Sequence, residues 1–366
     1  EFNFGGNMNW QQFRTAYDFR SGYATNLYAP VDAPISGTST FFSGDLDDPN
    51  PSARSIQLSA FASDTIGLWD DRILLTGGLR LQEITQKSYN VANGDLTSRL
   101  SSDAVTPVIG LVVKPTERIS LFANRIEGLQ PGTRAPVSGI DPDNTGAGQL
   151  PVTNGGQALA PARSVQYEVG GKIGFDRLQA SLALYQIEQP SFYLAADPDV
   201  AGSLRFGSYG EQRNRGIELF VTAQPVDGLR LIAGGSVVDA KLRRTPGGAN
   251  EGNDALGVPD YTLNANVEWD LPFVPGFTLT GRVIHTGEQA ANVTNTSYLD
   301  DWTTLDLGAR YVLATGGVPL TLRFGVDNVT NERFWSSSYS AFASGDTARL
   351  LQGRPRTYRG SVTVDF

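Results

Sequence analysis

Few side chains in this sequence belong to the types that do covalent chemistry or hold metal ions. His285 is the only histidine, and the chain has no cysteine. One histidine cannot build a multi-histidine metal site, and the lack of cysteine excludes disulfides and thiolate metal ligands. The acidic stretches Asp45–Asp48 and Asp141–Asp143 offer carboxylates of the kind that bind calcium, but their spacing does not match an EF-hand. We therefore expect no resident metal or cofactor, and no enzyme active site.

Charge and hydropathy narrow the class of protein further. The formal net charge is -9, which argues against nucleic acid as a partner. Charged residues make up only 18% of the chain, and no stretch approaches the ~20 consecutive apolar residues of a transmembrane helix. The chain therefore crosses a membrane with strands or does not cross one.

Fourteen stretches read as strands of about ten to fourteen residues, and their connections alternate between short and long. The short connections are Gly67–Asp71, Lys114–Glu117, Phe175–Arg177, Pro225–Asp227, Pro272–Pro275 and Ala314–Gly317. The long ones are Ser21–Ala53, Thr85–Asp103, Gly128–Ala162, Gln189–Glu211, Leu242–Gly257, Glu288–Asp300 and Val329–Arg354. A barrel in an outer membrane sorts its connections this way, with tight turns at the periplasmic rim and long loops outside.

Within the predicted strands, apolar and polar residues alternate with period two. Tyr261–Leu271 is a clear case, because Leu263, Val267 and Trp269 share one parity while the other carries Asn264 and Glu268. A soluble β-sandwich also alternates, but its dry core could not hold unpaired charges in mid-strand. We therefore predict an all-β fold: one antiparallel transmembrane β-barrel domain over residues 1–366, with lipid on the apolar parity and water on the other.

The final strand alternates as well and ends in an aromatic residue, Phe366. A terminal aromatic on such a strand resembles the signal that the outer-membrane assembly machinery (BAM) reads. This predicts that the chain is inserted in the outer membrane, in contact with its lipid, with Phe366 on the periplasmic side.

Eight segments, in order along the chain, resemble the strands of TonB-dependent siderophore receptors. They are Ser55–Asp64, Leu75–Arg80, Thr106–Pro115, Ile119–Asn124, Gly128–Gly132, Gln166–Gly170, Arg213–Glu218 and Gly325–Trp335. The resemblance implies a barrel of about 22 strands closed by a plug. No plug domain or TonB box is recognised before these segments, so the chain resembles the C-terminal barrel portion of such a receptor.

The same resemblance implies a function and partners. A receptor of this family binds a ferric siderophore outside the cell, so that iron arrives as a chelate, and uptake is driven through the TonB–ExbB–ExbD complex, which the missing N-terminal part would contact. Receptors for cobalamin or an oligosaccharide stay open as alternatives. A passive porin stays open too, because porins also carry charged rings across the lumen.

Siderophores are planar and often anionic chelates, so aromatic rings and cations near the long loops are the candidate ligand residues. We predict that the ligand contacts are made by Arg205, Tyr209, Tyr298, Trp302, Trp335 and Tyr339. Arginines of the polar parity, such as Arg282 and Arg323, are expected to pair with lumen carboxylates instead. His285 lies on the apolar parity, away from any lumen nucleophile, which argues against a catalytic barrel.

Overall fold

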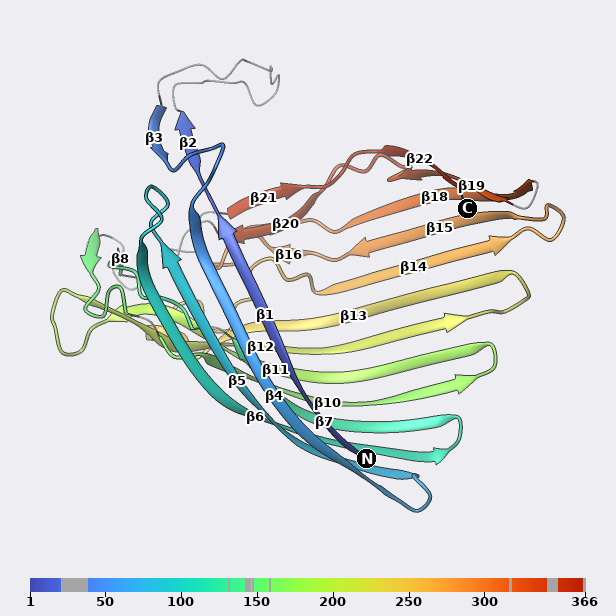
Figure 1. Ribbon diagram of the computed structural model, residues 1–366, viewed down its shortest axis with the longest axis horizontal. Coiled ribbons are helices and arrows are strands. Elements are labelled where there is room, and N and C mark those ends of the chain that lie inside the picture. The colour runs from blue at the N-terminus through green and yellow to red at the C-terminus, as the bar shows by residue number, and fades with distance from the viewer. Residues whose placement is uncertain are drawn as a thin grey trace.

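A computed structural model describes residues 1–20, 39–130, 132–141, 146, 148–157, 159–315, 318–340 and 348–364. Fourteen strands form one antiparallel sheet in which each strand pairs with its neighbours along the chain (Figure 1). The strands of this sheet are β1 (Phe2–Arg14), β4 (Pro51–Leu68), β5 (Ile73–Tyr89), β6 (Leu96–Thr116), β7 (Ile119–Gln130), β10 (Ala162–Phe175), β11 (Leu178–Ala196), β12 (Leu204–Ala223), β13 (Leu229–Arg243), β14 (Tyr261–Asp270), β15 (Phe277–Thr286), β18 (Trp302–Thr315), β19 (Val318–Asp327) and β22 (Thr357–Val364).

The sheet curves into a trough whose edge strands are β1 and β22 (Figure 1). No ladder joins β1 to β22 among the described residues, so the sheet has two free edges rather than a closed wall. All fourteen predicted strands are present in a single sheet, which excludes a two-sheet sandwich.

The two faces of the sheet differ as the alternation predicts. Leu263, Phe324 and Val362 are each more than half exposed on one face. On the other face, one hollow touches residues of eight consecutive strands, from Thr76 on β5 to Asn264 on β14. Only the concave side of a curved sheet can bring eight strands to one space, so the polar parity lines the concave face. The apolar parity lies on the convex face, where a transmembrane barrel meets lipid.

Short turns gather at one end of the strands and longer connections at the other (Figure 1). Positive φ angles at Trp69, Asp70 and Asp71 close the turn between β4 and β5, and Gly228 and Gly276 serve the turns before β13 and β15. Among the described residues, the opposite end carries small two-stranded hairpins and the 3-10 turn η2. They are β2 (Tyr17–Arg20) with β3 (Ser39–Ser43), β8 (Ser138–Ile140) with β9 (Gln149–Pro151), β16 (Gln289–Ala290) with β17 (Tyr298–Leu299), β20 (Trp335–Ser340) with β21 (Ala348–Gln352), and η2 (Pro246–Gly248).

The predicted strand lengths are wrong for several strands. β6 runs for 21 residues, and β11 and β12 for 19 and 20. The segments Thr85–Asp103 and Gln189–Glu211, predicted as long loops, are largely strand: β5 and β6 stay paired as far as Tyr89 and Leu96. In the extension of β5, Gln86, Lys87 and Ser88 are polar on both parities, and in the extension of β11 the residues from Phe192 to Ala196 form an apolar run. Neither extension alternates, so no period-two pattern marks the strand.

Parts of the predicted features fall outside the described residues: the terminal aromatic Phe366, Pro142 and Asp143 of the acidic stretch, and Gly316 and Gly317 of the short connection Ala314–Gly317. Within the described part of the chain, no helix combines the length and apolar character needed to cross a bilayer.

Candidate ligand site on the loops and the concave face

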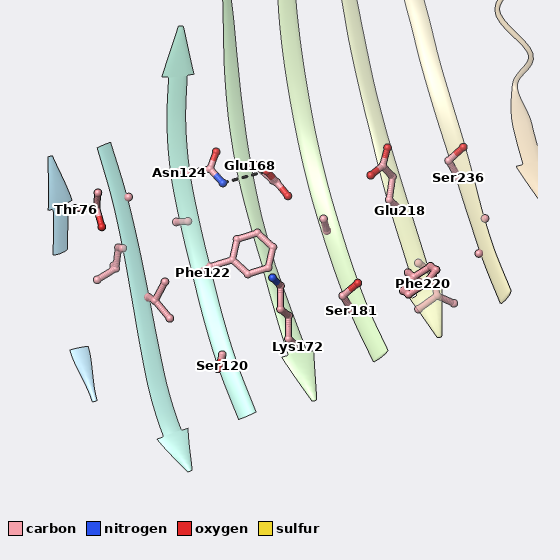
Figure 2. A pocket seen from close by; sticks show the side chains of 18 of the residues that line it. Thr76, Ser120, Phe122, Asn124, Glu168, Lys172, Ser181, Glu218, Phe220 and Ser236 are labelled. Carbon is pink, nitrogen blue, oxygen red and sulfur yellow. Dashed lines mark hydrogen bonds between the residues drawn. The ribbon is translucent and has the colours of Figure 1, made fainter. Parts of the chain in front are cut away.

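An acidic hollow of about 750 Å³ occupies the middle of the concave face (Figure 2). Its ionisable side chains are Glu168 and Glu218 and the single cation Lys172. Asn124 donates a hydrogen bond of 3.0 Å to Glu168, while Lys172 lies over the Phe122 ring at 5.5 Å. Two carboxylates against one ammonium group leave the hollow with a negative excess.

Ion pairs across neighbouring strands line the rest of the concave face. Arg230 on β13 contacts both Glu268, at 3.0 Å, and Asp270, at 2.7 Å, on β14. Arg282 on β15 pairs with Asp306 on β18. The prediction that lumen arginines pair with carboxylates is confirmed for Arg282. It is wrong for Arg323, which donates to the Thr363 hydroxyl at 3.3 Å and has no carboxylate within 4.0 Å among the described residues.

Four of the six predicted ligand residues lie near one another at the loop end of the sheet. Tyr298 is on β17, Trp335 and Tyr339 are on β20, and Trp302 begins β18. Ser338 on β20 donates a hydrogen bond of 2.8 Å to the carbonyl of Ala291, so the β20–β21 hairpin packs against the β16–β17 hairpin. This loop pair presents exposed aromatic rings: Tyr298, Trp335 and Tyr339 are 43%, 47% and 45% exposed.

Trp302 is placed differently from the other three. Its ring stacks on Phe334 with centroids 4.1 Å apart, and its indole nitrogen is buried without a hydrogen-bond partner in the described part of the chain. One face of the indole is therefore covered by the chain itself. Trp302 therefore packs against the loop that carries Trp335, and it offers a ligand less ring surface than the other three residues do.

The remaining two predicted residues, Arg205 and Tyr209, lie on β12 in a separate group. Arg205 is 3.9 Å from the carboxylate of Asp199, and Tyr209 is 40% exposed. The backbone there is fixed by the loop between β9 and β10, because Asn154 donates to the carbonyl of Phe206 at 2.7 Å and accepts from its N–H at 3.0 Å. The structure thus divides the six predicted residues into two groups.

A buried carboxylate fastens the same loop to the end of β11. Asp197 accepts a hydrogen bond from the hydroxyl of Thr153, and the backbone N–H of Asp199 donates to it at 2.8 Å. The Thr153 hydroxyl, followed by the Asp199 N–H, holds the pKa of Asp197 below its usual value, because hydrogen bonds to the charged form favour that form.

His285 lies where its parity predicts, on the convex face of β15. One ring nitrogen is 2.7 Å from the Thr303 hydroxyl and the other is 3.0 Å from the Tyr261 hydroxyl. Both nitrogens are thus engaged away from the concave face. Among the described residues, no group of three or more histidine and acidic side chains comes together as a metal site would require.

Sequence reasoning missed Asn328, which is 3% exposed and holds the base of the last long loop. Its side chain donates to the carbonyls of Glu332 and Arg354 at 2.9 and 3.0 Å and accepts from the Glu332 N–H at 2.8 Å. A positive φ of 51° at Asn328 turns the chain out of β19. Asparagine tolerates this conformation better than other side chains, which was the signal available in the sequence.

A model of the β-barrel of TonB-dependent receptor-like proteins matches residues 1–329. The chain belongs to the TonB-dependent receptor β-barrel family. Members of this family are outer-membrane proteins, so the predicted localisation and the transmembrane barrel architecture are confirmed. The open sheet of fourteen strands is thus part of a TonB-dependent receptor barrel.

The named relatives of this receptor barrel are receptors for different ligands. The chain is 37% identical over its whole length to the ferrichrome receptor FcuA of Yersinia enterocolitica, of which it covers 45%. It is 27% identical over 74% of its length to the metal-pseudopaline receptor CntO of Pseudomonas aeruginosa, covering 35% of that protein. The crystal structure of BauA, the ferric preacinetobactin receptor of Acinetobacter baumannii, matches all of the chain and 55% of BauA, with 27% identity and a TM-score of 0.73. The chain therefore spans about half the length of FcuA and of BauA, and about a third of the length of CntO.

Proposed function

We propose that this chain forms the barrel part of an outer-membrane receptor that takes up ferric siderophores, energised through the TonB–ExbB–ExbD complex. The observation that carries the proposal is the 37% identity, along the whole chain, to a protein named as a ferrichrome receptor. The match of the fold to a ferric preacinetobactin receptor supports it independently. On this proposal the protein has no resident cofactor and catalyses no reaction, because iron is cargo that enters and leaves as a chelate.

The exposed aromatic rings of the loop pair fit this role. Tyr298, Trp335 and Tyr339 lie at the end of the sheet opposite the short periplasmic turns, where a solute from outside arrives first. Flat rings offer stacking surface to a planar chelate at small cost in side-chain entropy. We propose these three residues, together with Arg205 and Tyr209, as ligand contacts, and Trp302 as a support beneath them.

Ligand binding by the full-length receptor, extracted from outer membranes, tests the proposal. Ferrichrome is titrated while tryptophan fluorescence is followed, since Trp335 lies in the proposed contact surface. Tyr339→Ala and Tyr298→Ala should each weaken binding on the order of 10-fold. Tyr358→Ala is the matched control, because Tyr358 is 65% exposed on the convex face and should not affect binding.

Uptake of radioactive iron by whole cells completes the test. Uptake of ferrichrome iron should require both the receptor and TonB. Failure of the full-length receptor to bind hydroxamate, catecholate and mixed ferric chelates would contradict the siderophore assignment, and binding of cobalamin or an oligosaccharide instead would replace it.

A further inference from the structure

Three cations lie side by side at the loop ends of β4, β5 and β6. Arg54 on β4 is the cross-strand partner of Lys87 on β5, and Lys87 is in turn the partner of Arg99 on β6. The three strands are neighbours in the sheet (Figure 1). Cross-strand partners project from the same face of a sheet, so these three residues, the basic row, form one line of positive charge.

The basic row belongs to the convex face, which meets lipid. The pairing runs without a register shift from the basic row toward the turns, so the row has the parity of Leu58 on β4, Leu81 on β5 and Val105 on β6. These apolar side chains are 44%, 58% and 42% exposed. Lys87 follows Leu81 by six residues, which is about 20 Å along a strand and about 15 Å along the membrane normal at a tilt of ~40°. The basic row therefore lies just outside the apolar band, at the level of the lipid headgroups.

The charge of the basic row is not balanced by the chain. Among the described residues, no carboxylate lies within 4.0 Å of any of its three cations. The nearest acids of the same parity along β5 and β6, Glu83 and Asp103, face each other four residues nearer the turns. Glu83 already accepts a hydrogen bond of 3.1 Å from Ser101. Like charges directly opposite in a sheet are destabilising, so an anion from outside the chain would stabilise the row.

Aromatic rings hold one end of the basic row in place. The guanidinium carbon of Arg54 is 5.8 Å from the ring centroids of both Trp10 and Tyr89, and Arg54 donates to the side-chain carbonyl of Gln12 at 2.7 Å. Its Nε atom is buried and has no hydrogen-bond partner in the described part of the chain. Tryptophan and tyrosine are the residues that mark the interface between lipid tails and headgroups in membrane barrels. Their presence places Arg54 at that interface.

A largely apolar hollow of about 610 Å³ lies next to the basic row, on its membrane side. Two thirds of the residues that line it have the convex parity, so it opens toward lipid. Glu83 and Asp103 line its end nearer the row, and the other convex residues are small or apolar: Gly6, Met8, Leu58, Ala60, Leu81 and Val105. A hydrocarbon chain fits such a hollow, and a headgroup attached to that chain would reach the basic row.

We propose that the basic row binds the phosphate groups of an acylated sugar phosphate of the outer leaflet, with an acyl chain of the same lipid in the hollow. The row spans two strand spacings, about 10 Å, which favours a lipid that carries more than one phosphate. Arginine and lysine both bind phosphate oxygens with charge-assisted hydrogen bonds. The inference rests on the outer-membrane location of the family and is independent of the siderophore.

Binding of detergent-solubilised diphosphoryl lipid A to the immobilised, delipidated full-length receptor tests the site, with surface plasmon resonance as the readout. Binding should weaken as salt is added, because the attraction is electrostatic. Lys87→Gln and Arg99→Gln should each weaken it by about 10-fold, whereas Lys87→Arg should retain it. Glu83→Gln should strengthen it, because a repelling carboxylate is removed.

Arg118→Gln is the matched control. Arg118 also lies over an exposed ring of the convex face, Phe175 at 5.5 Å, but it belongs to the turn between β6 and β7 at the opposite end of the strands. Its loss should leave the affinity for lipid A unchanged.

Thermal unfolding separates loss of binding from loss of fold. Without lipid, Lys87→Gln should be at least as stable as the wild type, because a repulsion is removed. Diphosphoryl lipid A should raise the unfolding temperature of the wild type and of Arg118→Gln, but not that of the double variant Lys87→Gln/Arg99→Gln.

The proposal is overturned if the wild type does not bind diphosphoryl lipid A, or if the double variant binds it as the wild type does. Equal weakening by Arg118→Gln would also overturn it. Displacement of the lipid by inorganic phosphate would assign the basic row to a soluble anion instead. Because the probe carries no iron, none of these outcomes bears on ferrichrome binding at the loops, and the two proposals are judged separately.

Discussion

The carboxylate of Asp306 joins Arg282 to the backbone of Asn328. One of its oxygens accepts from the Arg282 Nε at 2.7 Å, and the other accepts the N–H of Asn328 at 2.7 Å. Asp306 is an inward-facing residue of β18, while Asn328 is the first residue after β19. A single side chain thus connects the wall of the trough to the base of the loop that carries Trp335 and Tyr339.

Replacing Asp306 by asparagine should destabilise the protein by about 1.5–3 kcal/mol, because hydrogen bonds to a charged group are lost and Arg282 is left without its carboxylate. Denaturant unfolding of the purified receptor in detergent measures the change. Asp227→Asn is the control: Asp227 pairs with Arg177 but its side chain is 88% exposed, so the loss should stay below about 1 kcal/mol. Equal losses in the free energy of unfolding for the two substitutions would show that Asp306 does not stabilise the link between β18 and the base of the loop.

Substitutions of Asn328 should loosen the last long loop. Asn328→Gly removes the side-chain bonds to Glu332 and Arg354, and each buried group left unpaired costs about 1–3 kcal/mol. Asn328→Ala should cost about 1 kcal/mol more, since alanine is strained at a positive φ. Proteolysis of the loop between Asn328 and Arg354 on intact cells gives the readout.

Asn331→Gly provides the comparison for this loop. Asn331 also has a positive φ, of 56°, but within the described residues its side chain accepts a single exposed hydrogen bond, from the Arg356 N–H. Its replacement should leave cleavage close to the wild-type rate. Faster cleavage of Asn331→Gly than of Asn328→Gly would show that the Asn328 side chain does not hold the base of the loop.

The sheet could be predicted from the sequence because one face meets lipid and the other meets water, so apolar and polar residues must alternate along each strand. On β14, Leu263 and Trp269 could not exchange faces with Asn264 and Glu268 without placing a carboxylate in lipid. That constraint ends where the strands leave the membrane. The continuation of β5 through Gln86, Lys87 and Ser88 could not be predicted, since both faces are wet there.

The site was predicted less well because contacts between loops, rather than residue types, decide it. The aromatic character of Tyr298 and Tyr339 marks them as candidates, but that two hairpins bring them together depends on the hydrogen bond from Ser338 to Ala291. Likewise, nothing in the sequence near Trp302 shows that Phe334 covers its ring. Such contacts join residues far apart in the chain, and no periodic pattern in the sequence indicates them.

Acid should release the contact between Thr153 and Asp197. The pKa of Asp197 is lowered by the Thr153 hydroxyl, so the ionised carboxyl stabilises the folded loop. This stabilisation is complete above the unfolded pKa of about 3.9 and is lost as the pH falls through the lower folded value. A carbon-detected NMR titration of Asp197 should therefore show a pKa below 3.9.

Thr153→Val removes the largest cause of this shift. The pKa of Asp197 should move back toward its ordinary value, and the acid-sensitive part of the stability should shrink accordingly. A titration of Asp197 that is unchanged in Thr153→Val would assign the shift to the backbone N–H of Asp199 instead.

Arginine scanning on two adjacent residues of β14 tests which face meets lipid. Ala265 is exposed on the convex face, and Asn264 lines the acidic hollow. Ala265→Arg should destabilise the protein by about 2–4 kcal/mol, because a guanidinium near the bilayer midplane must leave water. Asn264→Arg should cost little, since its side chain enters a wet space with a negative excess from Glu168 and Glu218. Unfolding in lipid vesicles measures both, and a larger loss for Asn264→Arg would reverse the assignment of the two faces.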